Sequence, residues 1–391
     1  MNLIINTSKK HICIFNALYY PHTGGVERYV HQLALHLTEK DIDVTIVTFN
    51  TENVSPFEIT ENLKIYRLPS INFLGGRYPL PKYNKEYFRL KKEIEAIGFD
   101  FIITNMRFYL SSLIAAKIAR RKKIPILLIE HTTGHFTVNN KLFDWIGHHY
   151  EHFISNLIKK RVNYFYGVSK ACSNWLTHFG INSNGEIFNG VDCDYKIKSY
   201  FDIREKFNLP DDSIILFFAG RLILEKGILF LAEAVKELSP KIDNLYLFIA
   251  GVGPLYDEIK RKYGNSKNII LLNQIEYDAV MTFLKQTDIV VIPSYYPEGL
   301  PTLILEAGAS KCPVISTPMG GAKEIITDVN YGLIIEPKNV EELKKAIIFL
   351  IENPDKRETI GENLHRRICE KYDWNIITDN LLTELDKIKN D

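Results

Sequence analysis

The chain has 391 residues, of which 46% are hydrophobic and 24% charged, as in ordinary globular proteins of two or three domains. Its formal net charge of +1 argues against a general binder of nucleic acid or another polyanion. The balance is uneven, because basic residues exceed acidic ones in residues 1–192 and acidic residues exceed basic ones in the remainder. The N-terminal half is therefore the better candidate to contact an anionic surface.

The cysteines and the apolar runs bear on the location of the protein. Five cysteines are scattered without a CxxC pair, which indicates a reducing cytosol and no structural zinc. No apolar run reaches the roughly 18 residues of a membrane-spanning helix, and Met1–Asn6 lack the charged and apolar regions of a signal peptide. We expect a soluble cytoplasmic protein, at most peripheral to the inner face of the cell membrane.

In the first half, short apolar runs alternate with segments of helical periodicity, which is typical of βαβ units in a parallel sheet. The first run is followed by a helix that carries Val26, Val30 and Leu33 on one stripe. A long helical segment ends near Arg161. The runs that we predict as strands are Ile12–Phe15, Val44–Phe49, Leu63–Leu68, Phe101–Thr104, Ile126–Ile129 and Tyr164–Val168.

Residues 72–92 mix aromatic and basic side chains around a Gly75-Gly76 turn. An ordinary helix with a solvated basic face accounts for this mixture. The same composition is also typical of a segment that lies on anionic lipid headgroups. The residues alone leave both interpretations open.

The second half restarts the alternation after a weakly patterned stretch, Asn189–Ser199, that suits a linker. A last amphipathic helix, about Trp374–Ile388, has no strand after it and could pack across both halves. We therefore predict two doubly wound α/β domains, residues 1–192 plus 371–391 and residues 193–370. The second set of predicted strands is Ser213–Ala219, Leu245–Ala250, Ile269–Leu272, Ile289–Ile292, Val314–Ser316 and Leu333–Ile335.

Two loops that follow strands of the second half have unusual composition. Gly220–Gly227 carries Arg221 and Lys226 just before a predicted helix. Fixed cations beside a helix amino terminus can bind a diphosphate without a metal ion, although surface charge is the plainer interpretation. Gly251–Pro254 lacks the third glycine of a dinucleotide fingerprint, so we interpret it as a tight turn near the same edge.

The stretch Pro293–Glu306 contains two glutamates eight residues apart, Glu298 and Glu306. It leaves a buried strand, turns at Pro297–Gly299 and enters a helix near Pro301. With Glu298 in the loop and Glu306 in the helix, both could line the crevice where open α/β sheets bind ligands. The alternative is that neither acid belongs to a site, with Glu298 an ordinary acid at a helix start and Glu306 a solvated helical acid.

Three further positions lie at predicted strand ends. The glycine pairs Gly24-Gly25 and Gly320-Gly321 would let the backbone approach a ligand closely, or they serve only as turns. His131 follows a strand, and a second histidine lies four residues later. A single histidine is usually structural, but two at this position make a role in a site equally plausible.

In their order and spacing these segments resemble the retaining glycosyltransferases of family 4, also described as glycosyl transferases group 1. The resemblance covers nearly the whole chain. It implies the GT-B fold, with two facing Rossmann-like domains and a C-terminal crossover helix. The matching segments are Gly24–Glu27, His131, Val168-Ser169, Asn189–Asp192, Gly220–Gly227, Gly251–Pro254, Asp288–Ser294, Glu298–Glu306 and Gly320–Glu324.

The resemblance implies a nucleotide-sugar donor on the second domain and an acceptor on the first. Arg221 and Lys226 would bind the diphosphate and stabilise the leaving group, and Glu306 would bind the ribose hydroxyls. Glu298 would contact the donor sugar, and His131 would help to stabilise the transition state. Backbone contacts to the sugar or phosphate are implied for Gly24, Gly25, Gly299, Leu300, Pro301 and Thr302.

The implied activity is metal-independent, needs no cofactor and retains the configuration of the sugar. A hexosyl group would pass from a UDP- or GDP-sugar to a saccharide or lipid-linked saccharide during synthesis of a surface glycan. Leu300-Pro301 stands where many members have Phe-Gly, so we expect a changed pocket shape with activity retained. The N-terminal domain could contact an anionic membrane.

Two alternatives remain at this stage. A nucleotide-sugar 2-epimerase would use the same fold without an acceptor, although the Glu298–Glu306 spacing argues against it. A binding module without catalysis is disfavoured because all the candidate residues are present. The DxD patterns at Asp41–Asp43 and Asp192–Asp194 are discounted as metal sites, because one starts a strand and the other lies in a linker turn.

Overall fold

The computed structural model describes residues 9–137 and 140–390, so Met1–Asn6 lie outside the described residues. The chain divides into two compact units. The N-terminal unit comprises residues 1–189 and 374–391, and the C-terminal unit comprises residues 190–373. Within the described ranges, no helix is both long and apolar enough to cross a membrane.

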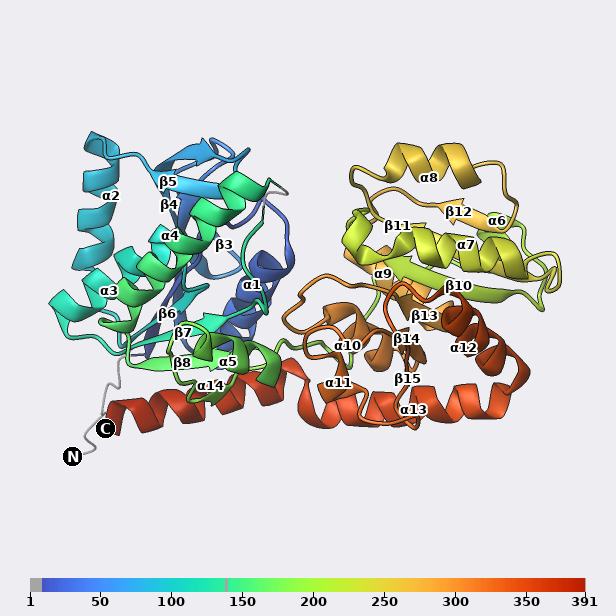
Figure 1. Cartoon of the computed structure of the whole chain (residues 1–391). Helices are drawn as coiled ribbons and strands as arrows, with labels where there is room; N and C mark the ends of the chain where they lie inside the picture. The colour runs from blue at the N-terminus through green and yellow to red at the C-terminus, as the bar shows by residue number, and fades with distance from the viewer. Residues whose placement is uncertain (1–8, 138–139, 391) are drawn as a thin grey trace, which may run out of the picture. The chain divides into compact units, whose positions relative to one another are not determined.

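The N-terminal unit is built on a largely parallel sheet with the strand order β3-β4-β2-β1-β6-β7-β8-β9, and β5 pairs with β4. Only β3 and β5 run antiparallel to their neighbour among the described strands. Its elements are β1 His11–Phe15, α1 Gly25–Glu39, β2 Asp43–Asn50, β3 Phe57–Thr60, β4 Leu63–Phe73, β5 Tyr78–Pro81, α2 Lys85–Ala96, β6 Phe101–Asn105, α3 Leu110–Lys122, β7 Ile126–Glu130, α4 Lys141–Lys159, β8 Tyr164–Gly167, α5 Lys170–Thr177, β9 Gly185–Glu186 and α14 Trp374–Asn390 (Figure 1).

The C-terminal unit has an entirely parallel sheet with the order β12-β11-β10-β13-β14-β15. Its order reverses between β10 and β13, which is where such sheets bind ligands. Its elements are α6 Ile203–Phe207, β10 Ile214–Ala219, the 3-10 turn Leu224–Lys226, α7 Ile228–Leu238, β11 Leu245–Ala250, α8 Tyr256–Tyr263, β12 Ile269–Leu271, α9 Tyr277–Gln286, β13 Ile289–Ile292, α10 Thr302–Ala309, β14 Val314–Ser316, α11 Ala322–Ile325, β15 Leu333–Ile334, α12 Val340–Glu352 and α13 Pro354–Lys371.

Both sheets are buried on two faces, which explains why their strands are continuous apolar runs. Every residue of β6, β7 and β11 is buried. On β10, Phe218 belongs to the core under α7, whereas Phe217 stacks on Phe283 of α9 with ring centroids 5.1 Å apart. Because alternate side chains of a strand point to opposite faces, β10 joins the two layers.

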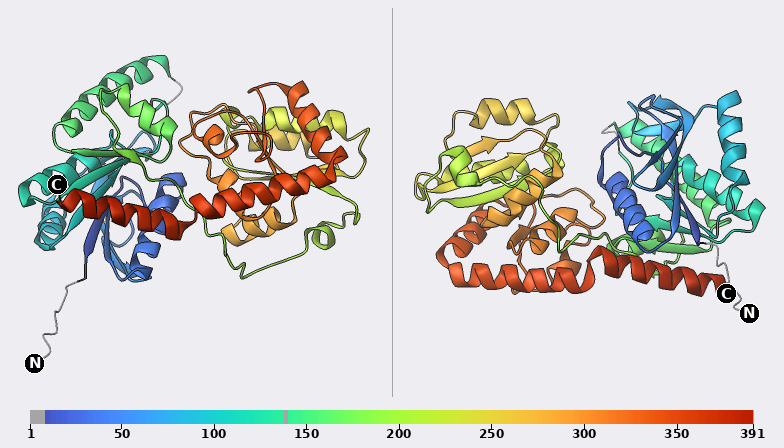
Figure 2. Two further views of the ribbon diagram at one scale, coloured as in Figure 1. Left: turned by 90° about the horizontal axis from the view of Figure 1, so that it is seen from below. Right: turned by 180° about the vertical axis from the view of Figure 1, so that it is seen from behind.

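The crossover predicted for the last helix is confirmed, because α14 packs on α1 of the N-terminal unit. Trp374 stacks on His36 and lies against Tyr29, with ring centroids 5.7 and 5.6 Å apart. The dark red helix and the blue α1 lie side by side in both views of Figure 2.

The structure differs from the sequence predictions in two regions of the N-terminal unit. The strand expected at 63–68 continues to Phe73 as β4, and the short β3 that pairs with it was not predicted. The stretch 72–92 is not one helix, because Tyr78–Pro81 forms β5 before α2 begins. β3 and the end of β4 are exposed and lack the apolar run by which buried strands are identified. β5 is largely buried, but it has only four residues and two of them are prolines, which argue against a strand.

Two of the cysteines that are scattered in the sequence are bonded to each other in the fold. Cys193 and Cys369 form a disulfide with their Cα atoms 5.7 Å apart, although 176 residues separate them in the sequence. The bond joins the first and last segments of the C-terminal unit, so sequence spacing could not reveal it. Cys13, Cys172 and Cys312 are buried.

Candidate functional site

In the C-terminal unit, the loops that follow β10, β11, β13 and β14 lie against one another at the carboxyl edge of the sheet. Leu222 donates its amide to the carbonyl of Val252 at 2.9 Å, and Tyr295 donates its amide to the carbonyl of Glu225 at 2.8 Å. Gly321 donates its amide to the carbonyl of Gly299, also at 2.8 Å. The loops are therefore fixed mainly by backbone hydrogen bonds.

Two glycines make this close packing possible. Gly227 has φ +73°, and a Cβ there would lie 2.0 Å from the carbonyl oxygen of Pro293. Gly320 has φ +56°, and its Cβ would lie 2.0 Å from the carbonyl oxygen of Glu298. Any other residue would therefore be strained in its backbone and would push the Pro293–Pro301 loop away. For Gly320 the sequence left open a close approach to a ligand or a turn alone, whereas in the fold it makes room for a neighbouring loop.

The structure brings two of the predicted site residues together, Lys226 and Glu298. The Lys226 Nζ lies 2.6 Å from the Glu298 Oε1, and both side chains are only partly exposed. Lys226 lies in the loop that follows β10, and Glu298 lies in the loop that follows β13. The pair therefore spans the point where the strand order reverses. The Arg221 side chain is exposed on the same β10 loop.

Glu306 lies on the first turns of α10 and is buried, with 4% of its surface exposed. Pro301 caps this helix and Thr302 is its first residue. Pro301 has no N–H, so it cannot supply the backbone donor that the resemblance implied for it. Gly299 and Leu300 keep their amides as candidate donors at the turn.

In the N-terminal unit, Gly24 caps α1 and Gly25 is its first residue. Both are exposed, and a Cβ on Gly25 would meet nothing within 4 Å. The N-terminus of this 15-residue helix carries the positive end of its dipole, and the Glu27 carboxylate of the first turn already lies against it, since a Cβ on Gly24 would be 2.2 Å from the Glu27 Oε2.

His131 lies close to the same helix. Its ring is edge-on to the Tyr29 ring of α1 with centroids 4.8 Å apart, and its Nε2 lies 2.9 Å from the Asn105 Oδ1. Burial lowers the pKa of His131 to about 4, although the nearby Glu130 carboxylate opposes this shift. The imidazole is therefore neutral at physiological pH.

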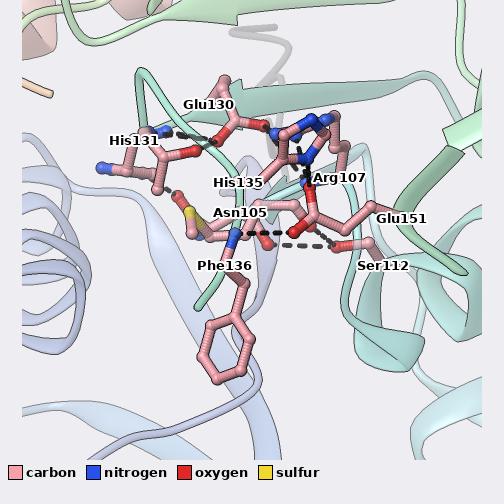
Figure 3. Close-up of polar contacts among 10 residues, drawn as sticks. Asn105, Arg107, Ser112, Glu130, His131, His135, Phe136 and Glu151 are labelled. Carbon is pink, nitrogen blue, oxygen red and sulfur yellow. Dashed lines mark hydrogen bonds and ion pairs between the residues drawn. The ribbon is translucent and has the colours of Figure 1, made fainter. Parts of the chain in front are cut away.

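A buried ionic network beneath His131 was not predicted from the sequence. Arg107 is fully buried and donates to Glu130 at 2.6 Å and to Glu151 at 3.0 Å (Figure 3). The second oxygen of Glu130 accepts from the amides of His131 and Thr132, both at 3.1 Å. The network therefore fixes the start of the loop that carries His131.

The pKa values of the two carboxylates of this network are shifted in opposite directions. Burial acts to raise the pKa of Glu130, but Arg107 and the hydroxyl of Thr132 outweigh it, so the pKa is lowered. Burial raises the pKa of Glu151 to about 7 in spite of Arg107 and the amide of Phe136. Arg107 and Glu130 both come after predicted strands. Charged residues just after a strand are candidates for a site, so this placement could have identified both residues from the sequence.

One of the discounted DxD patterns lies at the opposite edge of its sheet from the loop that carries His131, and the other lies beside a hydrogen bond to Asp373. Asp41 and Asp43 stand at the amino end of β2, the opposite edge of the sheet from His131. Asp41 forms an ion pair with Lys9. Cys193, between Asp192 and Asp194, donates its amide to Asp373 at 3.2 Å.

Two family models match the chain, one in each half. The model described as Glycosyltransferase Family 4 matches residues 23–195, and the one described as Glycosyl transferases group 1 matches residues 199–367. An uncharacterised glycosyltransferase of Methanocaldococcus jannaschii is 29% identical over 376 residues, which cover 93% of this chain and 95% of that protein.

A human protein and a solved structure are also similar. The human protein is a subunit of phosphatidylinositol N-acetylglucosaminyltransferase, and it is 26% identical over 98% of this chain and 77% of its own length. The structure of Anabaena HepE with UDP and glucose superposes with a TM-score of 0.75, at 17% identity, over 97% of this chain and all of that chain.

Proposed function

Because this chain belongs to family 4 of the glycosyltransferases and has the GT-B fold, we propose that it transfers a hexosyl group from a UDP- or GDP-sugar to a saccharide or lipid-linked saccharide. The observation that carries the proposal is the Lys226–Glu298 pair at the edge where four loops of the C-terminal unit converge. Because both side chains are partly exposed, a ligand can replace Glu298 as the partner of Lys226, and Lys226 as the partner of Glu298.

The first step of the proposed reaction is an exchange of partners. The donor diphosphate, with two negative charges, replaces Glu298 as the partner of Lys226, and Arg221 supplies a second cation. Glu298 can then accept hydrogen bonds from hydroxyls of the donor sugar, and Glu306 from those of the ribose. We propose that these cations neutralise the diphosphate without a metal ion.

The second step breaks the bond between the anomeric carbon and the diphosphate oxygen. Lys226, Arg221 and the amides of Gly299 and Leu300 stabilise the negative charge that develops on the leaving group. The acceptor oxygen attacks from the same face, and its proton passes to the departing phosphate oxygen, so the configuration is retained.

The proposed donor is supported by the HepE structure, which was solved with UDP and glucose, but UDP and GDP need to be compared directly. Calorimetry of the wild type with each nucleoside diphosphate identifies the base. Arg221→Ala should weaken the better ligand about 10- to 100-fold, the loss expected for a charge-assisted hydrogen bond. Lys267→Ala removes an exposed cation elsewhere in the same unit and should bind normally; equal affinity in both variants would contradict the assignment of Arg221.

Catalysis is tested separately from binding. Glu298→Gln keeps the shape of the side chain but removes its charge, so donor hydrolysis and transfer should fall at least about 100-fold while nucleotide affinity changes little. NMR of the wild type with donor alone must show slow hydrolysis; interconversion of sugar epimers would instead identify an epimerase.

A lipid-linked acceptor is supported by an exposed apolar face of α4 in the N-terminal unit. Leu142, Phe143, Trp145, Ile146 and Phe153 are each about half exposed or more. A helix with a large apolar face and an aromatic anchor can lie in the interface of a bilayer. The similar human protein is named for transfer to phosphatidylinositol, which is a membrane lipid.

Flotation with liposomes that contain anionic lipid tests this contact. The Trp145→Ser, Phe153→Ser double variant should lose most of the bound fraction. Ile59→Ser removes an equally exposed apolar side chain from β3 of the same unit and should float as the wild type does. Absence of wild-type binding at low salt would end the membrane proposal and leave the transferase proposal intact.

A further inference from the structure

Four histidines of the N-terminal unit gather beside the loop that follows β7. His135 lies in that loop, His148 and His152 lie one turn apart on α4, and His178 ends α5. The His135 ring stacks on His148 with centroids 4.0 Å apart, and the rings of His152 and His178 are 5.0 Å apart. The proposed transferase reaction uses none of these four side chains.

Three of the rings can point a nitrogen at one place. One ring nitrogen each of His135, His152 and His178 lies within 4.8 Å of the other two. Nitrogens around a tetrahedral zinc ion are roughly 3.4 Å apart, since each Zn–N bond is about 2.0–2.1 Å. Neither His152 nor His178 is buried, so small rotations of these side chains can close the difference.

The surroundings hold His135 in the orientation that a metal needs. The Glu151 Oε2 lies 3.0 Å from the His135 Nδ1, which leaves Nε2 as the ring nitrogen that can bind an ion. A carboxylate on the far nitrogen of a metal-bound imidazole is the usual arrangement of the surrounding shell. Arg107 in turn holds Glu151, as Figure 3 shows.

The charge of the surroundings also permits a cation. The guanidinium of Arg107 is paired with two carboxylates, Glu130 and Glu151, so its positive charge is compensated. The indole of Trp175 lies parallel to the His178 ring with centroids 4.7 Å apart and interplanar angle 6°. That stacking limits the orientations that the His178 ring can take.

We propose that His135, His152 and His178 bind a zinc ion, which ties the loop that carries His131 to α4 and α5. Imidazole nitrogens suit zinc and its late transition-metal neighbours, whereas magnesium and calcium prefer oxygen. The prediction of no structural zinc considered only the cysteines and could not find this cluster, because its members come from three segments of the chain. The ion would stabilise the loop and take no part in sugar transfer.

The test uses full-length protein without a polyhistidine tag, stripped of metal by a chelator and dialysed. Calorimetry with zinc chloride should show one equivalent bound, and cobalt(II) should give the intense visible absorption of a tetrahedral site. Zinc should also raise the melting temperature, since the folded state alone presents the assembled ligands.

Variants separate this site from adventitious binding. His152→Ala and His178→Ala should each weaken zinc binding roughly 100-fold or more, because each removes a direct ligand. His149→Ala is the matched control, since His149 is exposed on α4 and its ring lies 4.5 Å from Trp145 instead. Circular dichroism establishes that each variant is folded, and His178→Gln serves as a second substitution at that position.

Three results would overturn the proposal. The wild type could fail to bind zinc saturably at micromolar concentration, His152→Ala and His178→Ala could both bind as it does, or His149→Ala could weaken binding as much as they do. Donor hydrolysis is assayed in parallel, so loss of zinc binding with normal hydrolysis leaves the proposed function untouched.

Discussion

The loop after β7 in the N-terminal unit and the loop after β13 in the C-terminal unit are held in different ways. Both follow buried parallel strands and both carry a candidate site residue, His131 in one and Glu298 in the other. The first is fixed by buried charge, because Arg107 pairs with Glu130 and Glu151. The second is fixed by backbone packing against glycines.

This difference separates charges that support the fold from charges that can meet a ligand. In the N-terminal unit the cation is fully buried and already paired with two carboxylates. In the C-terminal unit Lys226 and Glu298 remain partly exposed, and backbone contacts hold the loops that carry them. Removing a charge should therefore harm stability in the first unit and ligand binding in the second.

The tryptophans allow the two units to be followed separately. All three, Trp145, Trp175 and Trp374, belong to the N-terminal unit. Tryptophan fluorescence therefore follows unfolding of that unit alone, whereas circular dichroism follows both. Comparing the two transitions assigns a destabilised variant to one unit.

The largest loss of stability is expected for Arg107→Ala. It leaves Glu130 and Glu151 buried without their cation, and breaking a buried pair in this way costs about 3–5 kcal/mol. The free energy of unfolding measured by denaturant and tryptophan fluorescence checks this value.

Arg120→Ala is the control for that change, since Arg120 is exposed near the end of the neighbouring α3. It should alter the free energy of unfolding by less than about 0.5 kcal/mol. If Arg107→Ala were equally mild, the buried network would not be what holds the β7 loop.

The next largest effect is expected for Gly320→Ala. The added Cβ meets the carbonyl of Glu298 and the backbone has φ +56°, so we expect a loss of about 2–4 kcal/mol. The transition seen by circular dichroism should move to lower denaturant while that seen by tryptophan fluorescence stays. Nucleoside diphosphate affinity should fall as well, because the Glu298 turn is displaced.

Gly98→Ala is the control for a glycine without such a neighbour. A Cβ at Gly98 meets nothing within 4 Å, and the substitution should change the free energy of unfolding by less than about 1 kcal/mol. An equal loss in both variants would mean that close approach to Glu298 is not the cause.

The fold was largely predictable from the sequence because its strands are buried on both faces. Runs such as Ile126–Ile129 contain little besides β-branched and large apolar residues, and they identify parallel strands without an alignment. β3 and the end of β4 were missed because they are exposed and therefore carry no apolar pattern. β5 was missed although it is largely buried, because it has only four residues and two of them are prolines.

The sequence identified candidate site residues at strand ends, but it did not identify the side chains that they contact. The position of Lys226 before a helix suggested a phosphate site, yet its contact with Glu298 depends on two loops 72 residues apart. Glu151 lies in the middle of α4 and looks like any helical acid in the sequence. Only the packing of α4 against Arg107 shows that it is buried and paired.

An intermediate effect is expected from pH, through His131. Its folded pKa of about 4 lies below the unfolded value near 6.5, so the unfolded chain binds a proton that the folded chain does not. This contribution to stability is complete above about pH 6.5 and is lost as the pH falls towards 4. Between pH 7 and pH 5 the loss amounts to about 2 kcal/mol.

The variant His131→Gln isolates this contribution from other titrating groups. The wild type should lose about 2 kcal/mol more than the variant does between pH 7 and pH 5, measured by fluorescence-detected unfolding. The same dependence in both proteins would show that His131 is not held neutral by burial.

The smallest effect on stability is expected for Lys226→Ala, and it tests the comparison most directly. The Lys226–Glu298 pair is partly exposed, so its loss should cost at most about 1 kcal/mol in the transition seen by circular dichroism. Nucleoside diphosphate affinity measured by calorimetry should nevertheless fall about 10- to 100-fold, because the cation contacts the ligand.

Arg107→Ala should do the reverse under conditions where it remains folded, with a large loss of stability and nearly normal nucleotide affinity. If Lys226→Ala instead cost several kcal/mol and bound nucleotide normally, its charge would support the fold as Arg107 does.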